Sequence, residues 1–214
     1  MLTPSLVSGR DYAVAGAQTG PTAIEPVTNL PADLLGQVSL YGSTHRSSTP
    51  RPGTLYVFDI GGNDIMSALN KYGANVPAVN NVVVAAETNT VDAIKSLYAL
   101  GARNILFYEV PDLGLTPRFY NTALQGYASF YAKWFDNTLL SDSRLSPYKQ
   151  YGGLKVFDLD TYDLLDAANT TARPSASPTS PTRAGPAALP AQLREVSAPR
   201  RIRICSGTLC IRPQ

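Results

Sequence analysis

Histidine, cysteine and charged residues are all scarce in this sequence of 214 residues, and each shortage limits the kinds of catalytic or metal site that the chain could form. The only histidine, His45, lies among Ser, Thr, Arg and Pro without apolar periodicity around it, so we expect a solvated loop residue rather than a catalytic base. The only two cysteines, Cys205 and Cys210, are compatible with a short disulfide or redox loop but match no metal-binding spacing. A Gly-rich phosphate cradle is also missing. We therefore expect no metal ion and no cofactor.

Long hydrophobic runs are missing as well. No apolar stretch is long enough to span a membrane, and the first residues lack the basic and apolar regions of a signal peptide. The composition is nevertheless 44% hydrophobic and only 16% charged, which favours one globular domain with a substantial core. We expect no stable membrane insertion of this segment, and the sequence leaves the oligomeric state open.

The net charge of +2 comes from the end of the chain. From residue 172 onward there are seven Arg, no Lys and one acidic residue, which leaves eleven basic and fifteen acidic residues elsewhere, a net charge of −4. The same stretch holds seven of the seventeen prolines. We therefore predict a domain over residues 1–170 and a disordered tail over 171–214. The basic cluster at 200–203 is too short to indicate a nucleic-acid partner.

An apolar strand followed by a glycine turn is the central feature of the sequence. Residues 55–60 are rich in apolar, aromatic and β-branched types, and Gly61-Gly62-Asn63-Asp64 follows directly. In open α/β sheets, ligands sit just beyond the carboxyl ends of the strands. The side chain of Asn63 could donate to a developing oxyanion there, and Asp64 could cap the next helix. Alternatively, both are ordinary turn and cap residues.

Helices and strands alternate along the rest of the chain. Leu34, Leu35, Val38 and Tyr41 share one helical face after Asp33, a suitable cap. A long helical spacing runs from Val79 to Tyr98, and further strands are expected over 104–110 and 154–160. A helix is expected to begin at Thr116 and Pro117. This alternation predicts an α/β fold with a parallel sheet and helices on both faces.

Several segments resemble one family of enzymes. Tyr12-Ala13-Val14-Ala15-Gly16-Ala17 and Gly61-Gly62-Asn63-Asp64 are similar to two blocks of the GDSL, or SGNH, ester hydrolases. The segments 100–106 and 111–117 resemble runs typical of the bacterial secreted or autotransporter-type branch. The resemblance covers about residues 2–168.

The resemblance implies a three-layer α/β/α, flavodoxin-like domain and hydrolysis of small-molecule or lipid esters through a serine acyl-enzyme. It assigns Gly16 as a backbone N–H donor and Asn63 as a side-chain donor to one oxyanion hole. It also implies that the full-length protein is secreted or associated with the outer membrane.

Two blocks of the family pattern are absent from the sequence. The Gly-Asp-Ser-Leu block, with the serine nucleophile and the central first strand of the sheet, should precede residue 1, and no D-x-x-H block supplies the histidine base. A serine needs such a base within hydrogen-bond reach, and His45 falls in the wrong loop. We therefore expect a truncated chain without esterase turnover of its own. Two alternatives stay open: a non-catalytic protein that binds acyl or glycan ligands, and an unrelated flavodoxin-like binder.

The tail also has the character of a translation in the wrong frame. If each codon is rebuilt from the last base of one codon and the first two of the next, residues 174–184 permit F-G-F-T-N-V-T-D-A-C. Residues 203–214 then permit Y-L-F-W-D-P-V-H-P-T-T in the same frame. The first string resembles the loop before the family's last block, and the second contains a D-x-x-H block. We predict a frameshift, in the gene or in its sequencing, near residue 171.

Overall fold

A three-stranded parallel sheet forms the centre of the computed structural model, which describes residues 11–20, 33–45, 53–150 and 152–171. The strands are β1 (Leu55–Asp59), β2 (Asn104–Tyr108) and β3 (Lys155–Leu159), in the order β1-β2-β3. Val57 lies opposite Leu106, and Leu106 lies opposite Phe157. The expected disordered tail lies outside the described residues.

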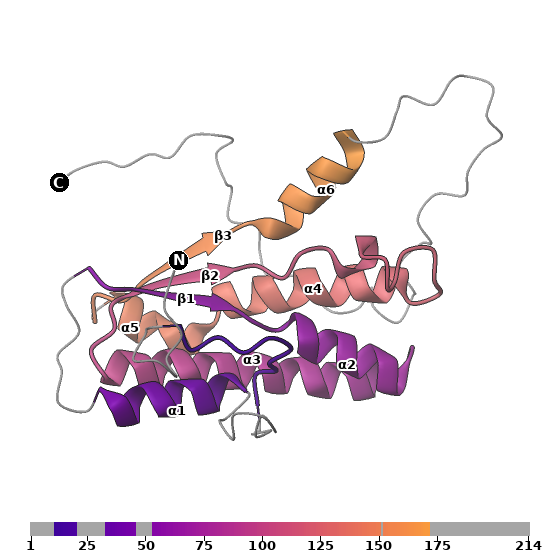
Figure 1. Cartoon of the computed structure of the whole chain (residues 1–214). Coiled ribbons are helices and arrows are strands. Elements are labelled where there is room, and N and C mark those ends of the chain that lie inside the picture. Colours follow the sequence, from indigo (N-terminus) through magenta and orange to yellow (C-terminus); the bar gives the residue numbers. More distant parts are fainter. Residues whose placement is uncertain (1–10, 21–32, 46–52, 151, 172–214) are drawn as a thin grey trace, which may run out of the picture.

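Helices connect the strands in the alternating order that the sequence predicts (Figure 1). They are α1 (Leu34–Thr44), α2 (Gly62–Tyr72), α3 (Val76–Ala99), α4 (Gln125–Leu140), α5 (Ser146–Gln150) and α6 (Thr161–Thr171). Short 3-10 turns span Leu113–Leu115 and Ser143–Leu145. The predicted α/β fold with a parallel sheet is confirmed. Among the described residues, no helix is long and apolar enough to cross a bilayer.

Local signals in the sequence explain where the first helices begin. The Asp33 carboxylate accepts a hydrogen bond from the Gly36 N–H at 2.7 Å and caps α1, as expected. Asn75 caps α3 through the Ala78 N–H, and Pro77 lies in its first turn, where a missing N–H costs nothing. These caps fix the two helices that pack side by side beneath β1 (Figure 1).

The helix expected to begin at Thr116 and Pro117 is a wrong prediction. Asp112 instead accepts a hydrogen bond from the Gly114 N–H and stabilises a 3-10 turn, and the chain passes through further turns before α4 begins at Gln125. The Asp112 carboxylate also accepts a hydrogen bond from the Ser129 hydroxyl at 2.5 Å. This anchoring to α4 comes from a residue distant in sequence, so the local pattern could not reveal it.

The two faces of the sheet differ strongly in burial. Phe58, Ile105 and Phe107 are buried beneath the helices, and the Phe107 ring lies 6.2 Å from that of Phe135 in α4. The strand residues on the opposite face include large apolar side chains that are roughly half exposed. These are Leu55, Val57, Phe157 and Leu159. The described helices therefore cover one face, and the second helical layer and first strand of the expected three-layer fold are not among the described residues.

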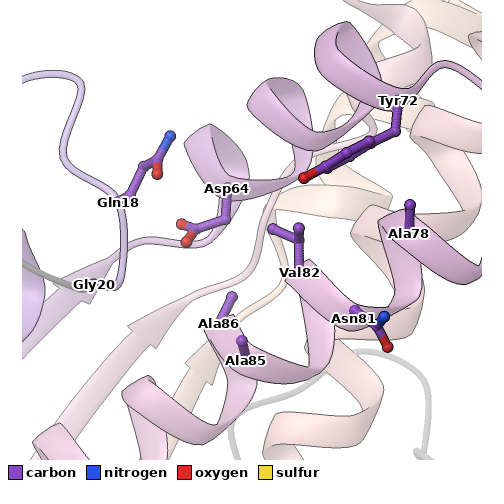
Figure 2. A pocket seen from close by; sticks show the side chains of 9 residues that line it. All are labelled: Gln18, Gly20, Asp64, Tyr72, Ala78, Asn81, Val82, Ala85 and Ala86. Carbon is purple, nitrogen blue, oxygen red and sulfur yellow. The ribbon is translucent and has the colours of Figure 1, made fainter.

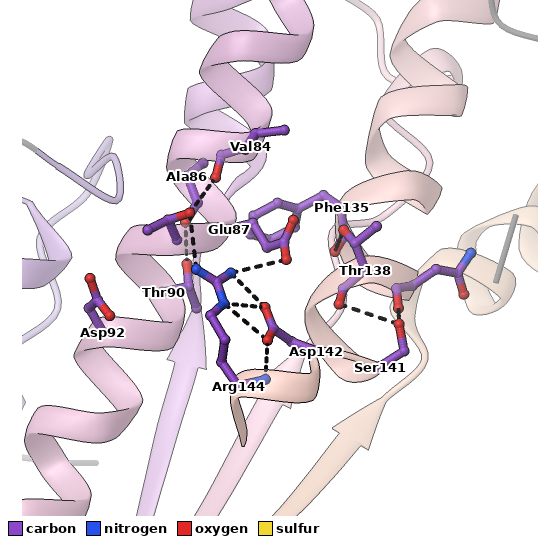
Figure 3. A network of polar contacts seen from close by, with 12 residues as sticks. Val84, Ala86, Glu87, Thr90, Asp92, Phe135, Thr138, Ser141, Asp142 and Arg144 are labelled. Carbon is purple, nitrogen blue, oxygen red and sulfur yellow. Dashed lines mark hydrogen bonds and ion pairs between the residues drawn. The ribbon is translucent and has the colours of Figure 1, made fainter. Parts of the chain in front are cut away.

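An arginine clamp ties the segment before β3 to α3 (Figure 3). The Arg144 guanidinium donates to the Asp142 carboxylate at 2.6 Å and to Glu87 at 3.3 Å. Burial alone would push the pKa of Asp142 up, but the hydrogen bonds from Arg144 bring it below its ordinary value. Arg144 lies eleven residues before the start of β3 at Lys155, and Glu87 lies near the middle of α3, so the clamp joins two segments that are far apart in the sequence.

Candidate functional site

Gly61 and Gly62 place Asn63 at the carboxyl end of β1. Gly61 has a φ of 102°, in the region that favours glycine, and the Phe135 ring packs directly against it. The turn is so tight that α2 begins at Gly62, which puts Asn63 and Asp64 in its first turn. Gly61 occupies the cap position without a side-chain hydrogen bond, so the interpretation of Asp64 as the cap is wrong.

Asp64 instead holds the segment around Thr19 against α2. Its carboxylate accepts the Thr19 N–H at 3.1 Å and the Thr19 hydroxyl at 2.7 Å, and both residues are buried. Burial raises the pKa of Asp64, while the hydrogen bonds from Thr19 act against that shift. The Asn89 side chain adds a donor to the Thr19 hydroxyl at 3.3 Å. A carboxylate that accepts several hydrogen bonds therefore fixes residues 17–20 onto the first turn of α2.

The structure brings the Asn63 side chain to the loop that contains Gly16. Asn63 Nδ2 donates to the carbonyl oxygen of Ala17 at 2.9 Å, although the two residues are 46 positions apart. The Ala17 N–H donates to the Val14 oxygen at 3.1 Å and closes a turn in which Gly16 has a φ of 78°. Gly16 is exposed, and its N–H makes no hydrogen bond with any other described residue. One potential donor, the Gly16 N–H, thus belongs to this turn, and a second, the Asn63 amide, contacts it.

A second polar group at this end of the sheet consists of the carboxyls of Glu109 and Asp136. Asp136 accepts the Val110 N–H at 2.9 Å, while its other oxygen and one oxygen of Glu109 are buried without a partner in the described part of the chain. Burial, assisted by the charges of Asp160 and its neighbours, raises the pKa of Glu109 to about 7. Burial, assisted by the nearby Glu109, raises the pKa of Asp136 to about 8.

These carboxyls do not form a metal centre in the described structure. Within residues 11–20, 33–45, 53–150 and 152–171, no three His, Cys, Asp or Glu side chains are grouped so that they could hold an ion. The sequence gave no signal for the pair, because Glu109 follows β2 while Asp136 projects from α4. Each is an acidic residue in an apolar segment, but their proximity depends on the packing of the helix.

His45 lies at the opposite end of the sheet. It follows α1, and its ring stacks on Tyr41 with centroids 4.3 Å apart. The Tyr41 hydroxyl in turn shares a hydrogen bond of 2.7 Å with the Tyr56 hydroxyl, near the start of β1. Asn63 comes after the end of that strand. His45 is half-buried rather than simply solvated, which corrects the sequence-based expectation.

Comparisons with known proteins give one family. A sequence model described as GDSL-like Lipase/Acylhydrolase matches residues 4–175, which is most of the chain. No curated protein matches the chain.

Proposed function

Because the chain belongs to the GDSL-like lipase/acylhydrolase family, whose members hydrolyse esters, we propose that its site evolved to cleave carboxylic esters through a serine acyl-enzyme. In this proposal, the N–H of Gly16 and the side-chain amide of Asn63 donate to the oxyanion of the tetrahedral intermediate. The observation that carries the proposal is the 2.9 Å hydrogen bond from Asn63 Nδ2 to the Ala17 oxygen, which holds that amide beside Gly16.

The amide geometry suits this role. A side-chain amide nitrogen carries two hydrogens, so one can stay on the Ala17 oxygen while the other meets the substrate. The first bond fixes the plane of the amide before the substrate arrives, and such preorganised donors stabilise charge without reorganising during the reaction. Asp64 supports the same arrangement, because its bonds to Thr19 immobilise the segment that follows the Gly16 turn.

The reacting groups would come from outside the present reading frame. His45 is the only histidine of the sequence and belongs to the amino end of the sheet, so it cannot serve a serine near Asn63. We propose that residues beyond about 171 are out of frame, that the restored frame supplies D-P-V-H, and that upstream codons supply the Gly-Asp-Ser-Leu block. The full-length protein would then be a secreted or outer-membrane member of the bacterial branch.

Resequencing the gene and restoring its frame tests this proposal. The 214-residue chain should show no turnover of p-nitrophenyl butyrate, whereas the extended, frame-corrected protein should hydrolyse it. In that protein, Asn63→Ala should lower kcat about 100- to 1000-fold, as expected for the loss of one oxyanion donor. A matched control, Asn70→Ala on the exposed side of the same helix, should leave kcat unchanged.

Two results would contradict the proposal. The first is turnover by the 214-residue chain that a serine-directed inhibitor abolishes. The second is a DNA sequence that confirms the present frame with codons that do not spell the two family-like strings.

A non-catalytic protein that binds acyl or glycan ligands is the second candidate. This candidate is favoured because His45 lies near the start of β1, whereas Asn63 follows the end of that strand. The proposed oxyanion donors are therefore present without a nearby histidine base. Confirmation of the present frame, together with ester binding by a stably folded 214-residue chain, would favour this candidate over the enzyme.

A further inference from the structure

A pocket and one face of the sheet are left open by the described residues. The pocket, of about 380 Å³, lies between α2 and α3 (Figure 2). Its only charged side chain, Asp64, is already bonded to Thr19, so the pocket presents no free charged group to a ligand. The open face of the sheet carries more information, because the strand register fixes where its apolar and charged side chains lie.

The centre of the open face is apolar. Every second strand residue projects to this face, and its middle row runs from Val57 over Leu106 to Phe157. Val57 is 55% exposed and Phe157 is 48% exposed. Leu55 and Leu159, which are also roughly half exposed, occupy two opposite corners of the same face. Contiguous apolar surface that is exposed in this way is typical of an interaction site.

The other two corners of the face carry opposite charges. Asp59 ends β1 and Lys155 begins β3, so they lie two strands and four residues apart, a distance of about 16 Å. They cannot pair with one another at that distance, and neither forms an ion pair with any other described residue. They are also the only charged strand residues on this face. A matching partner therefore offers an apolar centre with one charge of each sign at opposite corners.

We propose that the open face binds the same face of a second copy of this chain in a two-fold symmetric dimer. A two-fold axis in the interface, perpendicular to the line from Asp59 to Lys155, places each lysine over Asp59 of the partner subunit. The same axis brings Leu106 onto its own copy at the centre. The strands of the two sheets then cross at a steep angle, as in orthogonal sheet packing. This inference does not rest on the proposed ester hydrolysis.

Charge and size define the expected strength of this contact. The face has no excess of positive charge and the chain outside residues 172–214 has a net charge of −4, so an anionic lipid surface would not attract it. Three strands of five residues cover about 14 Å by 17 Å, or about 240 Å². Each partner of a standard protein interface buries about 800 Å². We therefore expect a weak dimer with a dissociation constant of about 10 to 100 µM.

Sedimentation equilibrium of the 214-residue chain tests the inference at about 5 to 500 µM, which spans the expected dissociation constant. The average mass should rise with concentration from the 22.9 kDa of one chain toward twice that value. Val57→Glu puts like charges near the centre of the interface and should weaken the dimer at least about 10-fold. Val84→Glu is the matched control and should have no effect, because Val84 is 47% exposed on α3, outside this face.

Exchange of the corner charges tests the two-fold arrangement. Lys155→Glu alone, or Asp59→Lys alone, brings like charges together across the interface and should weaken the dimer about 3- to 10-fold. The double variant should restore the affinity of the parent chain, because opposite charges meet again. Both residues are exposed, so these variants are expected to fold.

The outcomes distinguish the possible occupants of the face. A chain that stays monomeric throughout, or a dimer that Val57→Glu does not weaken, would overturn the inference. A monomer in which Val57→Glu lowers the free energy of unfolding would assign another segment of this chain as the cover, and a monomer that binds phosphatidylcholine vesicles would assign a lipid surface. A dimer that the double charge exchange fails to restore would overturn the two-fold arrangement. None of these results bears on the proposed oxyanion site.

Discussion

In the arginine clamp, the buried carboxylate of Asp142 is paired with Arg144, whereas at the carboxyl end of the sheet the carboxyls of Glu109 and Asp136 form no ion pair with any described residue. The pKa of Asp142 is lowered by its hydrogen bonds from Arg144, despite burial. Burial instead raises the pKa of Glu109 to about 7 and of Asp136 to about 8. Buried carboxyl groups are thus held charged in the clamp, whereas those of Glu109 and Asp136 have pKa values raised toward neutral pH.

This difference separates a structural ion pair from a polar group beside the proposed site. The clamp links η3, the 3-10 turn Ser143–Leu145, to α3, which is a structural task (Figure 3). Unpaired buried carboxyls are costly and persist where a fold has other reasons to keep them. Glu109 and Asp136 lie at the same edge as Asn63 and the Gly16 turn, where ligands of open α/β sheets bind.

Adding a methyl group at Gly61 should have the largest effect. A Cβ there would lie 2.7 Å from Cζ of the buried Phe135 ring, at a φ of 102°. Strain and overpacking together should lower the free energy of unfolding of Gly61→Ala by about 4 kcal/mol, measured by urea denaturation. The turn after β1 would then be lost, while the Arg144 clamp would be kept.

Gly153→Ala is the matched control at the amino end. Gly153 also has a positive φ, 68°, but a Cβ there would meet no atom within 4 Å. Gly153→Ala should therefore lower the free energy of unfolding by only about 1 kcal/mol, the cost of a left-handed backbone conformation for alanine. Equal losses for the two variants would contradict the close packing of Phe135 against Gly61.

Raising the pH should destabilise the protein through its carboxyl end. Because the pKa values of Glu109 and Asp136 are raised in the folded state, the folded protein still holds, between about pH 5 and 7, protons that the unfolded chain has already released. Their contribution to stability is therefore complete at low pH and is lost as the pH rises through the folded pKa values. The free energy of unfolding should fall by about 3 kcal/mol over this range.

Asp136→Asn tests the origin of that pH dependence. The amide oxygen can still accept the Val110 N–H, and the group no longer ionises. Unfolding measured at pH 5, 6 and 7 should show a flatter profile for the variant than for the parent protein. A slope that is unchanged in Asp136→Asn would assign the pH dependence to other groups.

Asp142→Asn should have a smaller effect with the opposite pH dependence. Its lowered pKa means that the stability from Asp142 is present above about pH 4 and is lost as the pH falls through the folded pKa. At pH 7 we expect a loss of about 1 kcal/mol, since Arg144 is 38% exposed and water screens the pair. Asp92→Asn, which breaks the exposed pair with Lys95, should change stability by less than about 0.5 kcal/mol.

The sequence predicted features that depend on neighbouring residues and missed those that depend on packing. The apolar run of β1, the Asp33 cap and the long helical spacing from Val79 to Tyr98 are local signals, and the structure confirms them. The partnership of Asp64 with Thr19 joins residues 45 positions apart, and no spacing rule reveals it. The approach of Asn63 to the Gly16 turn followed from a family resemblance rather than from the residues themselves.

Removing the histidine should have the smallest effect and separates the two ends most directly. The His45 ring stacks on Tyr41 and is half-buried, so His45→Ala should cost about 1 kcal/mol of stability or less. In the frame-corrected protein, the same substitution should leave kcat for p-nitrophenyl butyrate unchanged, because the ring lies at the amino end of β1. Alanine in place of the histidine in the restored D-P-V-H block should abolish turnover. A large loss of kcat in His45→Ala with normal stability would place the catalytic base at the wrong end of the sheet and overturn the assignment of Asn63.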